Sequence, residues 1–395
     1  MSIALKRADF DAATAFALSA AAKTEARDRI PILSTVGMRV NGRAEFIGTD
    51  LDVTASASID FDGDAFDAAI MAPVNVRQSV ARSGSEIVSL GEGKDGALTI
   101  ESGRLKIEGK SLPFDDFPID EPGDYVFAAT VADKFIATLA RVSAAASTEG
   151  IRYYLNGVYM HHVADWTYRL AATDGHRLYF ADVQLPDAEG IAKSERNDKG
   201  FIIPSKAVKL AIKHFARARN PVRLTVGQVR KSNKRSPRLD DSLNGTRITL
   251  SSDSDRMSCR LFAKLIDGTF PDYSRVIPVG NDKPLTVKRV DLRQAVQAVA
   301  GFGAEKTRAV KLQLVAGGVT VSLHSPENGK AAMTIDGNHA ATDFKIDFNG
   351  EYLLDILDRL TGEDVLFEFA DAASPTLIHN PADADFRVVL MPKRV

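Results

Sequence analysis

The chain runs through one order of elements three times, helix, strands, helix, strands, and this recurrence limits what it can fold into. Apolar residues at helical spacing predict a first helix in each copy, over Asp9–Lys23, Ala132–Ala146 and Val290–Gly301. An aspartate near each start is expected to cap the first turn: Asp9, Asp133 and Asp291. Copies of this length are whole domains rather than units of a solenoid.

Strand-like runs and a second helix follow each first helix. The strands are expected over Ile32–Val40, Ala44–Thr49, Tyr153–His161, Tyr168–Val183, Val310–Val315 and Val319–His324. The second helices are expected over Ala72–Ser83, Pro204–Arg219 and Gly350–Leu360. Each copy therefore predicts an α+β domain in which two helices pack on β-sheets.

Two short stretches, Asp120–Gly123 and Pro278–Pro284, are the expected linkers. The expected domains are 1–121, 122–280 and 281–395. The middle domain is longer because it contains two polar insertions, near 187–200 and 228–245. The second insertion is rich in Lys and Arg, and it is either a mobile polar loop or a contact for DNA or a partner.

The composition is that of an ordinary soluble protein, with 45% hydrophobic and 26% charged residues. No apolar run approaches the roughly 18 residues that a membrane span needs. The N-terminus lacks the basic and then apolar order of a signal peptide. Cys259 is the single cysteine, so an intrachain disulfide is impossible. These features predict a cytoplasmic protein.

Positive charge gathers in the helices. The six helix windows together carry a net charge of +7, whereas the whole chain carries −2. The most basic window has four residues on one side of a helix: Lys206, Lys209, Lys213 and Arg217. Val208, Ile212 and Phe215 form the opposite, apolar side. Such a face is either merely solvated or binds a phosphate backbone without reading its sequence.

The second helix of the third copy does not share this basic character. Its window contains three carboxylates, Glu351, Asp355 and Asp358, and has a net charge of −2. This helix does not fit the pattern of a positive helical layer.

A tight hairpin is expected at Asp174-Gly175, between the strand-like runs Tyr168–Thr173 and His176–Val183. The turn presents Thr173, Asp174, His176 and Arg177 together at one end of a sheet. It is either a polar hairpin tip or a functional surface, since loops on rigid strands often carry function.

An enzymatic interpretation would use Asp174 and His176 as an acid–base pair. However, a nucleophile motif such as GxSxG is missing, and GEGKDG (91–96) lacks the Lys-Ser or Lys-Thr ending of a phosphate-binding loop. A single cysteine excludes a multi-thiolate zinc site, and adjacent His161-His162 is not useful ligand spacing. The sequence therefore predicts a non-catalytic protein without metal or cofactor.

Several strings along the whole chain resemble one family, the bacterial DNA polymerase III β subunit or sliding clamp. In the first domain they are IPIL (30–33), GTDLD (48–52) and SLPFDDFP (111–118). Further along they are IRYYLNG (151–157), AATDGHRL (171–178), GTFPDYSRVIP (268–278) and VVLMPKRV (388–395). The ordered set is specific, although any single string would be weak.

The resemblance implies a head-to-tail homodimeric ring of six similar domains, with helices lining the hole and sheets outside. Such a ring encircles double-stranded DNA without sequence preference and tethers the replicative polymerase, which then rebinds its primer end at high effective concentration. An ATP-driven clamp loader must open it. Other polymerases and repair proteins would dock through short extended peptides. A protein scaffold of the same fold that does not bind DNA is the alternative.

The resemblance also implies a pocket for partner peptides beside the hairpin. By motif match its residues are Leu155, Thr173, Gly175, His176, Arg177, Leu178, Pro271, Arg275, Val276, Tyr352, Val389, Leu390, Met391, Pro392, Lys393, Arg394 and Val395. Two of them depart from the family pattern, since Lys393 replaces a common Met and Val395 a common Leu. Lys393 adds a charge to an apolar stem and predicts a preference for peptides with acidic residues.

Further residues match family positions near DNA and at the dimer interface. Arg27, Tyr153 and Tyr154 are expected near DNA, together with the basic helix face, although the tyrosine pair also fits a strand with one ring buried. Glu149, where a neutral residue is common, would weaken phosphate contact nearby. The dimer interface is expected to include Arg104, Lys106, Ile107 and Phe302, with edge strands paired across subunits.

Overall fold

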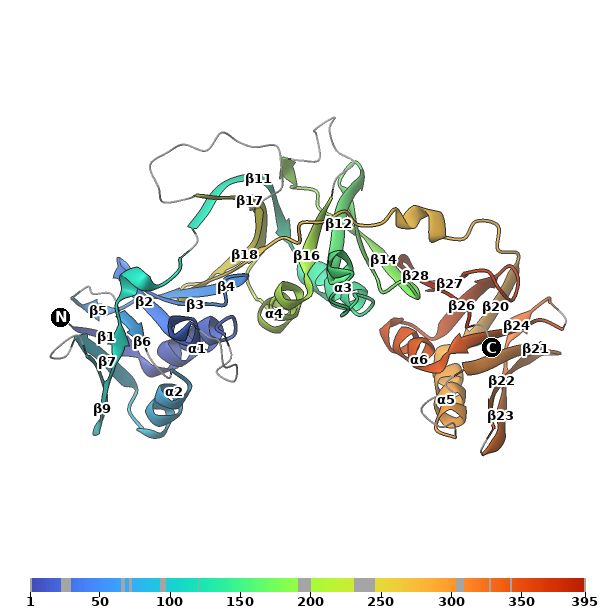
Figure 1. The fold of residues 1–395 in the computed structure, drawn as a ribbon, viewed down its shortest axis with the longest axis horizontal. Helices are drawn as coiled ribbons and strands as arrows, with labels where there is room; N and C mark the ends of the chain where they lie inside the picture. Colours follow the sequence, from blue (N-terminus) through green and yellow to red (C-terminus); the bar gives the residue numbers. More distant parts are fainter. Residues whose placement is uncertain are drawn as a thin grey trace. The chain divides into compact units, whose positions relative to one another are not determined.

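The computed structural model describes residues 2–22, 30–64, 68–70, 73–92, 97–119, 121–190, 200–230, 246–302, 309–326, 328–341 and 343–393. The chain gathers into two compact units (Figure 1). Unit 1 contains Met1–Ala137 and Leu185–Asp267, and unit 2 contains Thr138–Gln184 and Gly268–Val395. Both units draw on the predicted middle domain. The three domain boundaries therefore stay a prediction.

Unit 1 is built on a ten-stranded and a five-stranded antiparallel sheet, ordered β10-β6-β2-β3-β4-β19-β18-β17-β11-β15 and β5-β1-β7-β8-β9. The strands are β1 (Ser2–Lys6), β2 (Val36–Asn41), β3 (Arg43–Thr49), β4 (Val53–Ile59), β5 (Asp62–Gly63), β6 (Ala68–Ile70), β7 (Ile87–Glu92), β8 (Leu98–Ser102), β9 (Leu105–Gly109), β10 (Ser111–Leu112), β11 (Glu121–Val131), β15 (Glu189–Gly190), β17 (Val222–Arg230), β18 (Thr246–Asp253) and β19 (Met257–Lys264). A short β16 (Phe201–Pro204) bridges to Ile266 within the same unit.

The larger sheet runs through the junction of the first two repeats, because β4 pairs with β19. The helices α1 (Arg7–Leu18) and α4 (Ser205–Phe215) lie on the same face of this sheet, and α2 (Pro73–Arg82) packs against α1 (Figure 1). Gly48 in β3 permits the close approach of α1, since a Cβ there would lie 2.0 Å from the carbonyl oxygen of Ala17. Helix α1 therefore lies directly on the sheet at this point.

Unit 2 has a sheet ordered β12-β13-β14-β28-β27-β26-β20-β24 and a four-stranded sheet ordered β23-β22-β21-β25. Pairing of β14 with β28 joins the second and third repeats, as β4 and β19 join the first two. The strands are β12 (Gly157–Ala164), β13 (Thr167–Thr173), β14 (Arg177–Gln184), β20 (Lys283–Lys288), β21 (Ala309–Val315), β22 (Gly318–Ser325), β23 (Gly329–Asp336), β24 (Asn338–His339), β25 (Lys345–Asn349), β26 (Asp364–Phe369), β27 (Thr376–Asn380) and β28 (Asp383–Leu390).

The helices of the later repeats are α3 (Asp133–Ser143), α5 (Arg289–Ala300) and α6 (Gly350–Arg359). The chain passes from unit 1 to unit 2 within α3. In unit 2, α5 packs against α6 and against β22 and β23. All six predicted helices are present, each within a few residues of its expected range.

The predicted aspartate caps are wrong: α3 begins at Asp133 itself, so this residue lies inside the first turn, as Asp9 and Asp291 do in α1 and α5. Helices α1 and α5 follow Lys6 and Lys288, which make no side-chain cap. Asp9 and Asp291 lie inside the first turn, where a carboxylate interacts favourably with the helix dipole. Asn349 does cap a helix, because its side chain accepts a hydrogen bond from the Glu351 backbone N–H.

Two predicted strand starts are also wrong. Residues Pro31–Ser34 and Tyr153–Leu155 form single 3₁₀ turns, η1 and η4, before the strands β2 and β12. A proline at the first position of η1 fits this turn, since its fixed φ suits a helical start. The second polar insertion begins later than expected, because β17 continues to Arg230.

No helix among the described residues is long and apolar enough to cross a membrane. The same residues contain no group of three or more His, Cys, Asp and Glu side chains placed to hold a metal ion. Residues 191–199 and 231–245, the greater part of the two predicted insertions, lie outside the described ranges.

Candidate functional site

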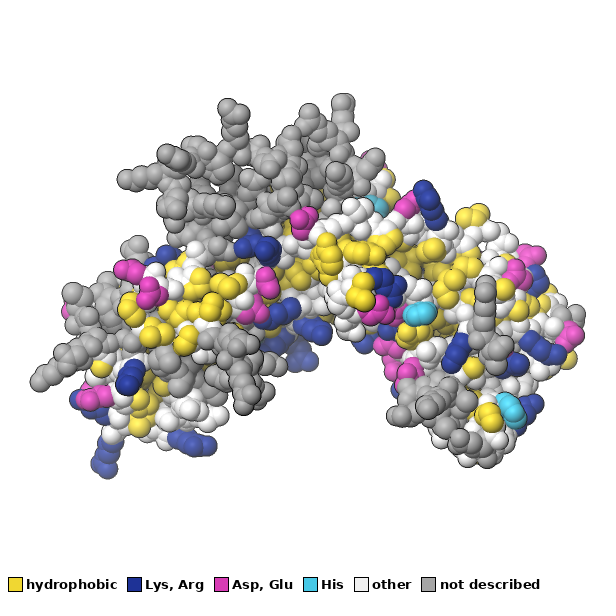
Figure 2. Space-filling model, viewed as in Figure 1, with side chains coloured by type: hydrophobic (Ala, Val, Ile, Leu, Met, Phe, Trp, Pro, Cys, Tyr) yellow, Lys and Arg dark blue, Asp and Glu magenta, His cyan; other side chains and the backbone are white. Residues whose placement is uncertain are grey.

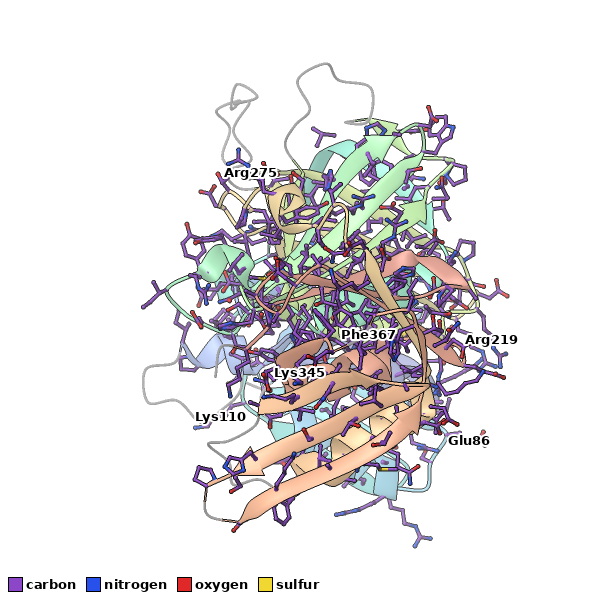
Figure 3. The ribbon with its side chains drawn as sticks, turned by 90° about the vertical axis from the view of Figure 1, so that its right-hand side faces the viewer. Glu86, Lys110, Arg219, Arg275, Lys345 and Phe367 are labelled. Atoms are coloured by element: carbon purple, nitrogen blue, oxygen red, sulfur yellow. The ribbon has the colours of Figure 1, made fainter. Side chains whose placement is uncertain are left out.

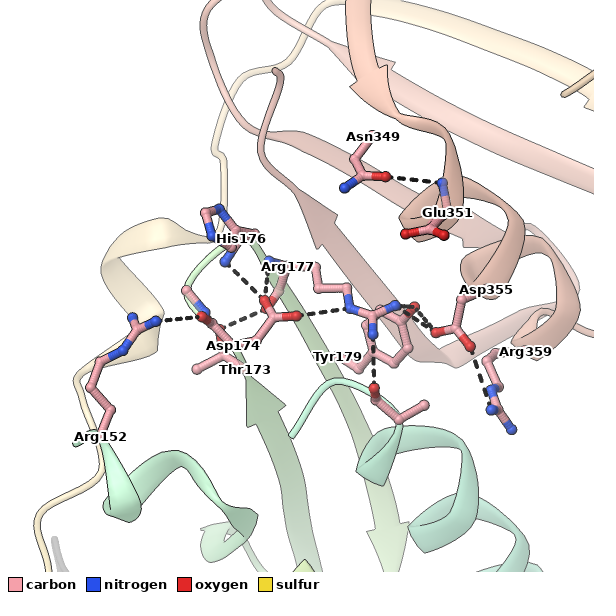
Figure 4. Close-up of polar contacts among 12 residues, drawn as sticks. Arg152, Thr173, Asp174, His176, Arg177, Tyr179, Asn349, Glu351, Asp355 and Arg359 are labelled. Carbon is pink, nitrogen blue, oxygen red and sulfur yellow. Dashed lines mark hydrogen bonds and ion pairs between the residues drawn. The ribbon is translucent and has the colours of Figure 1, made fainter. Parts of the chain in front are cut away.

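The hairpin predicted at Asp174-Gly175 is present, and its side chains hold the turn (Figure 4). The Asp174 carboxylate accepts hydrogen bonds from the backbone N–H groups of His176 and Arg177, at 2.9 and 3.0 Å. Thr173 Oγ1 accepts from Gly175 N–H and donates to the Arg177 carbonyl. Gly175 has a φ of 91°, a conformation that favours glycine. Asp174 thus shapes the turn, and the contacts of its carboxylate do not include the imidazole of His176.

The C-terminal strand lies beside this hairpin within unit 2. Strand β28 pairs with β14 so that Leu178 faces Val389 and Arg177 faces Leu390. Beyond the strand, the Met391 N–H donates to the His176 carbonyl at 2.9 Å. The Lys393 N–H donates to the carbonyl of Asp347 at 2.7 Å. The structure therefore brings together two motifs that are about 210 residues apart in the sequence.

Arg177 is the most heavily engaged side chain at the hairpin, with 12% of its side chain exposed. Its guanidinium donates to Asp355 at 2.6 Å, to Asp174 at 3.1 Å and to the Ala144 carbonyl at 2.9 Å (Figure 4). Tyr179 donates to the same Asp355 carboxylate at 2.9 Å, and burial raises the pKa of its phenol well above its usual value. The network ties the hairpin to α6 and to Ala144, the residue that follows α3.

Tyr352, also on α6, contacts Arg177 and His176 of this cluster. The Arg177 guanidinium lies over its ring, 4.6 Å from the centroid, and the His176 ring stacks on it at 6.1 Å. Burial raises the pKa of Tyr352. The ring and both basic side chains therefore form one continuous surface at the hairpin.

The connector that contains Pro271, Arg275 and Val276 makes several of its polar side-chain contacts within itself. These residues lie at or beside the turn η6 (Tyr273–Val276), and the exposed Arg275 side chain pairs with Asp272 (Figure 3). Phe270 anchors the connector to unit 2, since its ring stacks on Tyr159 at 4.8 Å. The contacts of the described residues do not link Pro271, Arg275 or Val276 to the hairpin.

Burial divides the predicted pocket residues into two groups. Four are buried and serve the core: Leu155, Leu178, Val389 and Leu390. The residues available to a partner are the exposed or half-buried ones: Thr173, Gly175, His176, Arg177, Pro271, Arg275, Val276, Tyr352, Met391, Pro392 and Lys393. Arg394 and Val395 lie outside the described residues.

The basic face predicted on α4 is present in unit 1. Lys206, Lys209, Lys213 and Arg217 are all exposed, whereas Val208 and Phe215 are buried and Ile212 is half-buried. Lys206 pairs with the Asp50 carboxylate and reaches the Ala20 carbonyl at 3.5 Å. Within the described residues, Lys209, Lys213 and Arg217 have no ion-pair partner. Elsewhere on the face seen in Figure 2, basic and acidic side chains are interspersed.

The other predicted DNA contacts differ in exposure. Tyr153 is 53% exposed and Tyr154 is half-buried on η4, with their rings edge to face at 5.9 Å. The expected strand with one ring buried is wrong here, because the pair lies on a turn. Glu149 pairs with Arg152 at 2.9 Å. Arg27 lies outside the described residues.

The acidic helix that did not fit a DNA-facing layer has partners of its own in unit 2. Asp355 binds Arg177, Tyr179 and Arg359, and Asp358 pairs with Arg293 on α5. Sequence reasoning missed Asp355 as a residue of the site. The sequence signal that could have identified it is a carboxylate in a negatively charged helix window, whereas the six helix windows together are positive.

The predicted dimer residues lie at sheet edges or beside them. β9, which contains Lys106 and Ile107, is the last strand of the five-stranded sheet, and Arg104 precedes it. Lys106 pairs within its own sheet, with Glu101 and Glu108. Phe302 is 39% exposed, and its carbonyl accepts from Asn328 just before the edge strand β23.

Repeated pairs of helices on sheets that run through the repeat junctions define a DNA clamp fold. A solved structure of the sliding clamp from Bartonella birtlesii, bound to griselimycin, matches all of both chains with a TM-score of 0.86 and 32% identity. The beta sliding clamp of Caulobacter vibrioides is 35% identical over 94% of both chains, and that of Escherichia coli is 28% identical over 93% of this chain and 94% of the relative.

Family models of the DNA polymerase III beta subunit match its central domain at residues 130–272 and its C-terminal domain at 274–394. The chain therefore belongs to the family of bacterial DNA polymerase III beta subunits, the beta sliding clamps. Members of this family are non-catalytic DNA sliding clamps, so the predicted class of protein is confirmed and a scaffold that does not bind DNA is not favoured.

Proposed function

We propose that this protein acts as a closed homodimeric ring that encircles duplex DNA and tethers the replicative polymerase. The observation that carries the proposal is the match to beta sliding clamps over 94% of the chain. An ATP-driven loader opens the ring, and the protein works in the cytoplasm on the nucleoid. The boundaries between the three domains lie near residues 121 and 280.

Partner peptides dock beside the hairpin of unit 2. Support comes from the cluster of Tyr352, His176 and Arg177 and from the exposed Met391 next to it. An apolar surface with few polar anchors suits an extended peptide, because backbone hydrogen bonds and side-chain contacts then share the affinity. The buried Leu155, Leu178, Val389 and Leu390 support this surface from below.

DNA runs along the exposed basic face of α4. Lys209, Lys213 and Arg217 carry this role, because their ammonium and guanidinium groups are exposed and unpaired among the described residues. Lys206 contributes less, since Asp50 already neutralises it. Such contacts are independent of DNA sequence, which sliding requires.

Two subunits join through the edges of their sheets. β9 of one subunit pairs with the edge strand β23 of the other, and Phe302 packs against Ile107 across the contact. Unpaired edge strands seek such partners, and the exposure of Phe302 beside β23 supports this arrangement.

A loading assay tests the ring. The protein is incubated with its cognate clamp loader, ATP and nicked circular DNA, and the mixture is passed through a gel-filtration column before and after one cut in the DNA. Co-elution that is lost after cutting is expected, because a closed ring slides off a free end. Co-elution that survives the cut would indicate ordinary binding and would contradict the proposal.

A further inference from the structure

Unit 1 contains a cavity between its two repeats that none of the proposed roles uses. Its volume is about 380 Å³, within the range of small-molecule sites. Helix α1, the C-terminal end of α4 and the β18–β19 hairpin supply its walls. The lining residues are Ala12, Ala15, Phe16, His214, Phe215, Ala218, Arg219, Asn220, Ser252, Ser254, Met257 and Cys259.

Aromatic rings form one wall of the cavity. The Phe16 ring stands edge-on to His214, with centroids 4.6 Å apart, and edge-on to Phe215 at 6.2 Å. Both phenylalanines are buried in the core. Alanines at positions 12, 15 and 218 leave the space open, because their side chains end at Cβ. A flat ring therefore has aromatic and thioether surface to contact, the latter from Met257.

One of the lining side chains, His214, has a polar atom without a partner. His214 Nε2 is buried and makes no hydrogen bond within the described residues. Burial lowers the pKa of this imidazole to about 4, with a smaller contribution from Lys213, so the ring is neutral at pH 7. A buried polar atom without a hydrogen bond is costly, and a ligand group would satisfy it.

The charge around the cavity selects the ligand further. Among the described residues, the lining has no carboxylate, and its one charged side chain is Arg219, which is exposed (Figure 3). A cation would find no counter-ion in this lining, and a charged group placed deep in the cavity would be desolvated without compensation.

We propose that this cavity is a binding site for a small neutral aromatic molecule that carries one N–H or O–H donor. The ring lies against Phe16, Phe215 and Met257, and the donor binds His214 Nε2 in the tautomer that leaves this nitrogen free to accept. The site is separate from the hairpin surface and from the exposed basic residues of α4.

Indole is a suitable probe, since it is a flat ring with one N–H donor. Saturation-transfer NMR on the full chain is expected to give a Kd below about 1 mM. Ala15→Leu fills the cavity and His214→Phe removes the acceptor, and each is expected to weaken binding at least about tenfold. Ala8→Leu is the matched control, because Ala8 is exposed on the same helix outside the cavity.

A second readout uses the wild-type protein alone. Cys259 lines the cavity and is the only cysteine, so its reaction with an aromatic disulfide reagent reports on this site. Indole is expected to slow that reaction to a plateau. No binding, an unchanged thiol rate, or equal affinities in Ala15→Leu and Ala8→Leu would overturn the site. An unchanged affinity in His214→Phe would overturn the assigned hydrogen bond.

Discussion

Arg177 and His214 are both basic side chains drawn into the protein, and they are accommodated in different ways. Arg177 keeps its charge, because two carboxylates, a phenol and a carbonyl surround it. His214 is neutral at pH 7, because burial beside the Phe16 ring and the nearby charge of Lys213 lower its pKa, and none of the described carboxylates binds it. The charged Arg177 therefore holds secondary-structure elements together, whereas the neutral His214 forms part of a cavity wall.

Replacement of Asp355 tests whether its carboxylate accommodates the charge of the buried Arg177. Asp355→Asn is expected to lower the free energy of unfolding by about 2 kcal/mol, because Arg177 would stay buried without its principal counter-charge. Asp358→Asn, three residues away on α6, is the control, since its pair with Arg293 is exposed and contributes little to stability. Guanidinium unfolding of both variants measures the difference. Equal effects would refute a special role for Asp355.

The neutral His214 predicts a specific pH dependence. The pKa of this imidazole lies below its unfolded value of 6.5, so the unfolded state binds the proton first as pH falls. The contribution of His214 to stability is therefore complete above pH 6.5 and is lost as the pH falls towards 4. The variant His214→Phe has no titratable group at this position, so it does not lose stability by this route as the pH falls. The difference in thermal midpoint between the two proteins, measured from pH 7.5 to 4, is expected to shift in favour of the variant.

Lys393 predicts partner choice at the hairpin. Lys393→Met removes one exposed charge and keeps the apolar stem, so peptides with acidic residues are expected to bind several-fold more weakly. Neutral peptides should be little affected. Fluorescence anisotropy with both kinds of native partner peptide measures the change. The prediction fails if all affinities stay the same.

At the level of elements, the six helices and the hairpin turn at Asp174-Gly175 were predicted correctly, whereas two 3₁₀ turns were missed. Six helices were predictable because 3.6-residue periodicity is a local property of the sequence. The starts of β2 and β12 were not, because η1 and η4 are single turns within strand-like letters. The partners of α6 were also hidden, since Asp355 meets Arg177 only after strands from two repeats have paired.

The basic face of α4 gives a prediction at this scale. Lys209→Glu with Lys213→Glu is expected to reduce the slope of log affinity against log salt by roughly two for a short duplex, because two phosphate contacts are lost. Arg260→Glu with Lys264→Glu changes the net charge equally on exposed positions of β19. Equal loss in both proteins would show that overall charge, and not the helix face, governs binding.

For the whole molecule, the sequence indicated three repeats and the family, while the division of contacts into two units could not be foreseen. Periodicity shows where strands form, but the partner of an edge strand depends on long-range packing. The pairings of β4 with β19 and of β14 with β28 are of this kind. The proposed pocket residues rest on motif resemblance, and only the structure separates the buried ones from the exposed ones.

The subunit contact can be tested on the intact protein. Phe302→Asp with Ile107→Ser is expected to reduce the mass in light scattering from twice 42.7 kDa to 42.7 kDa, because both sides of the apolar contact are weakened. Val163→Asp is the control, since Val163 is similarly exposed, at 42%, but lies on β12. A double variant that remains dimeric with an unchanged circular dichroism spectrum would place the contact elsewhere.

The pairing of β14 with β28 also has a consequence during synthesis. β14 ends at Gln184 and its partner begins at Asp383, about 200 residues later. At roughly 5–20 residues per second, the ribosome needs about 10–40 s to supply that partner. Throughout this interval the edge of β14 that later pairs with β28 has no partner strand. This edge includes Arg177, at the end of β14 next to the hairpin. The nascent chain must therefore keep an open strand from premature association until β28 emerges.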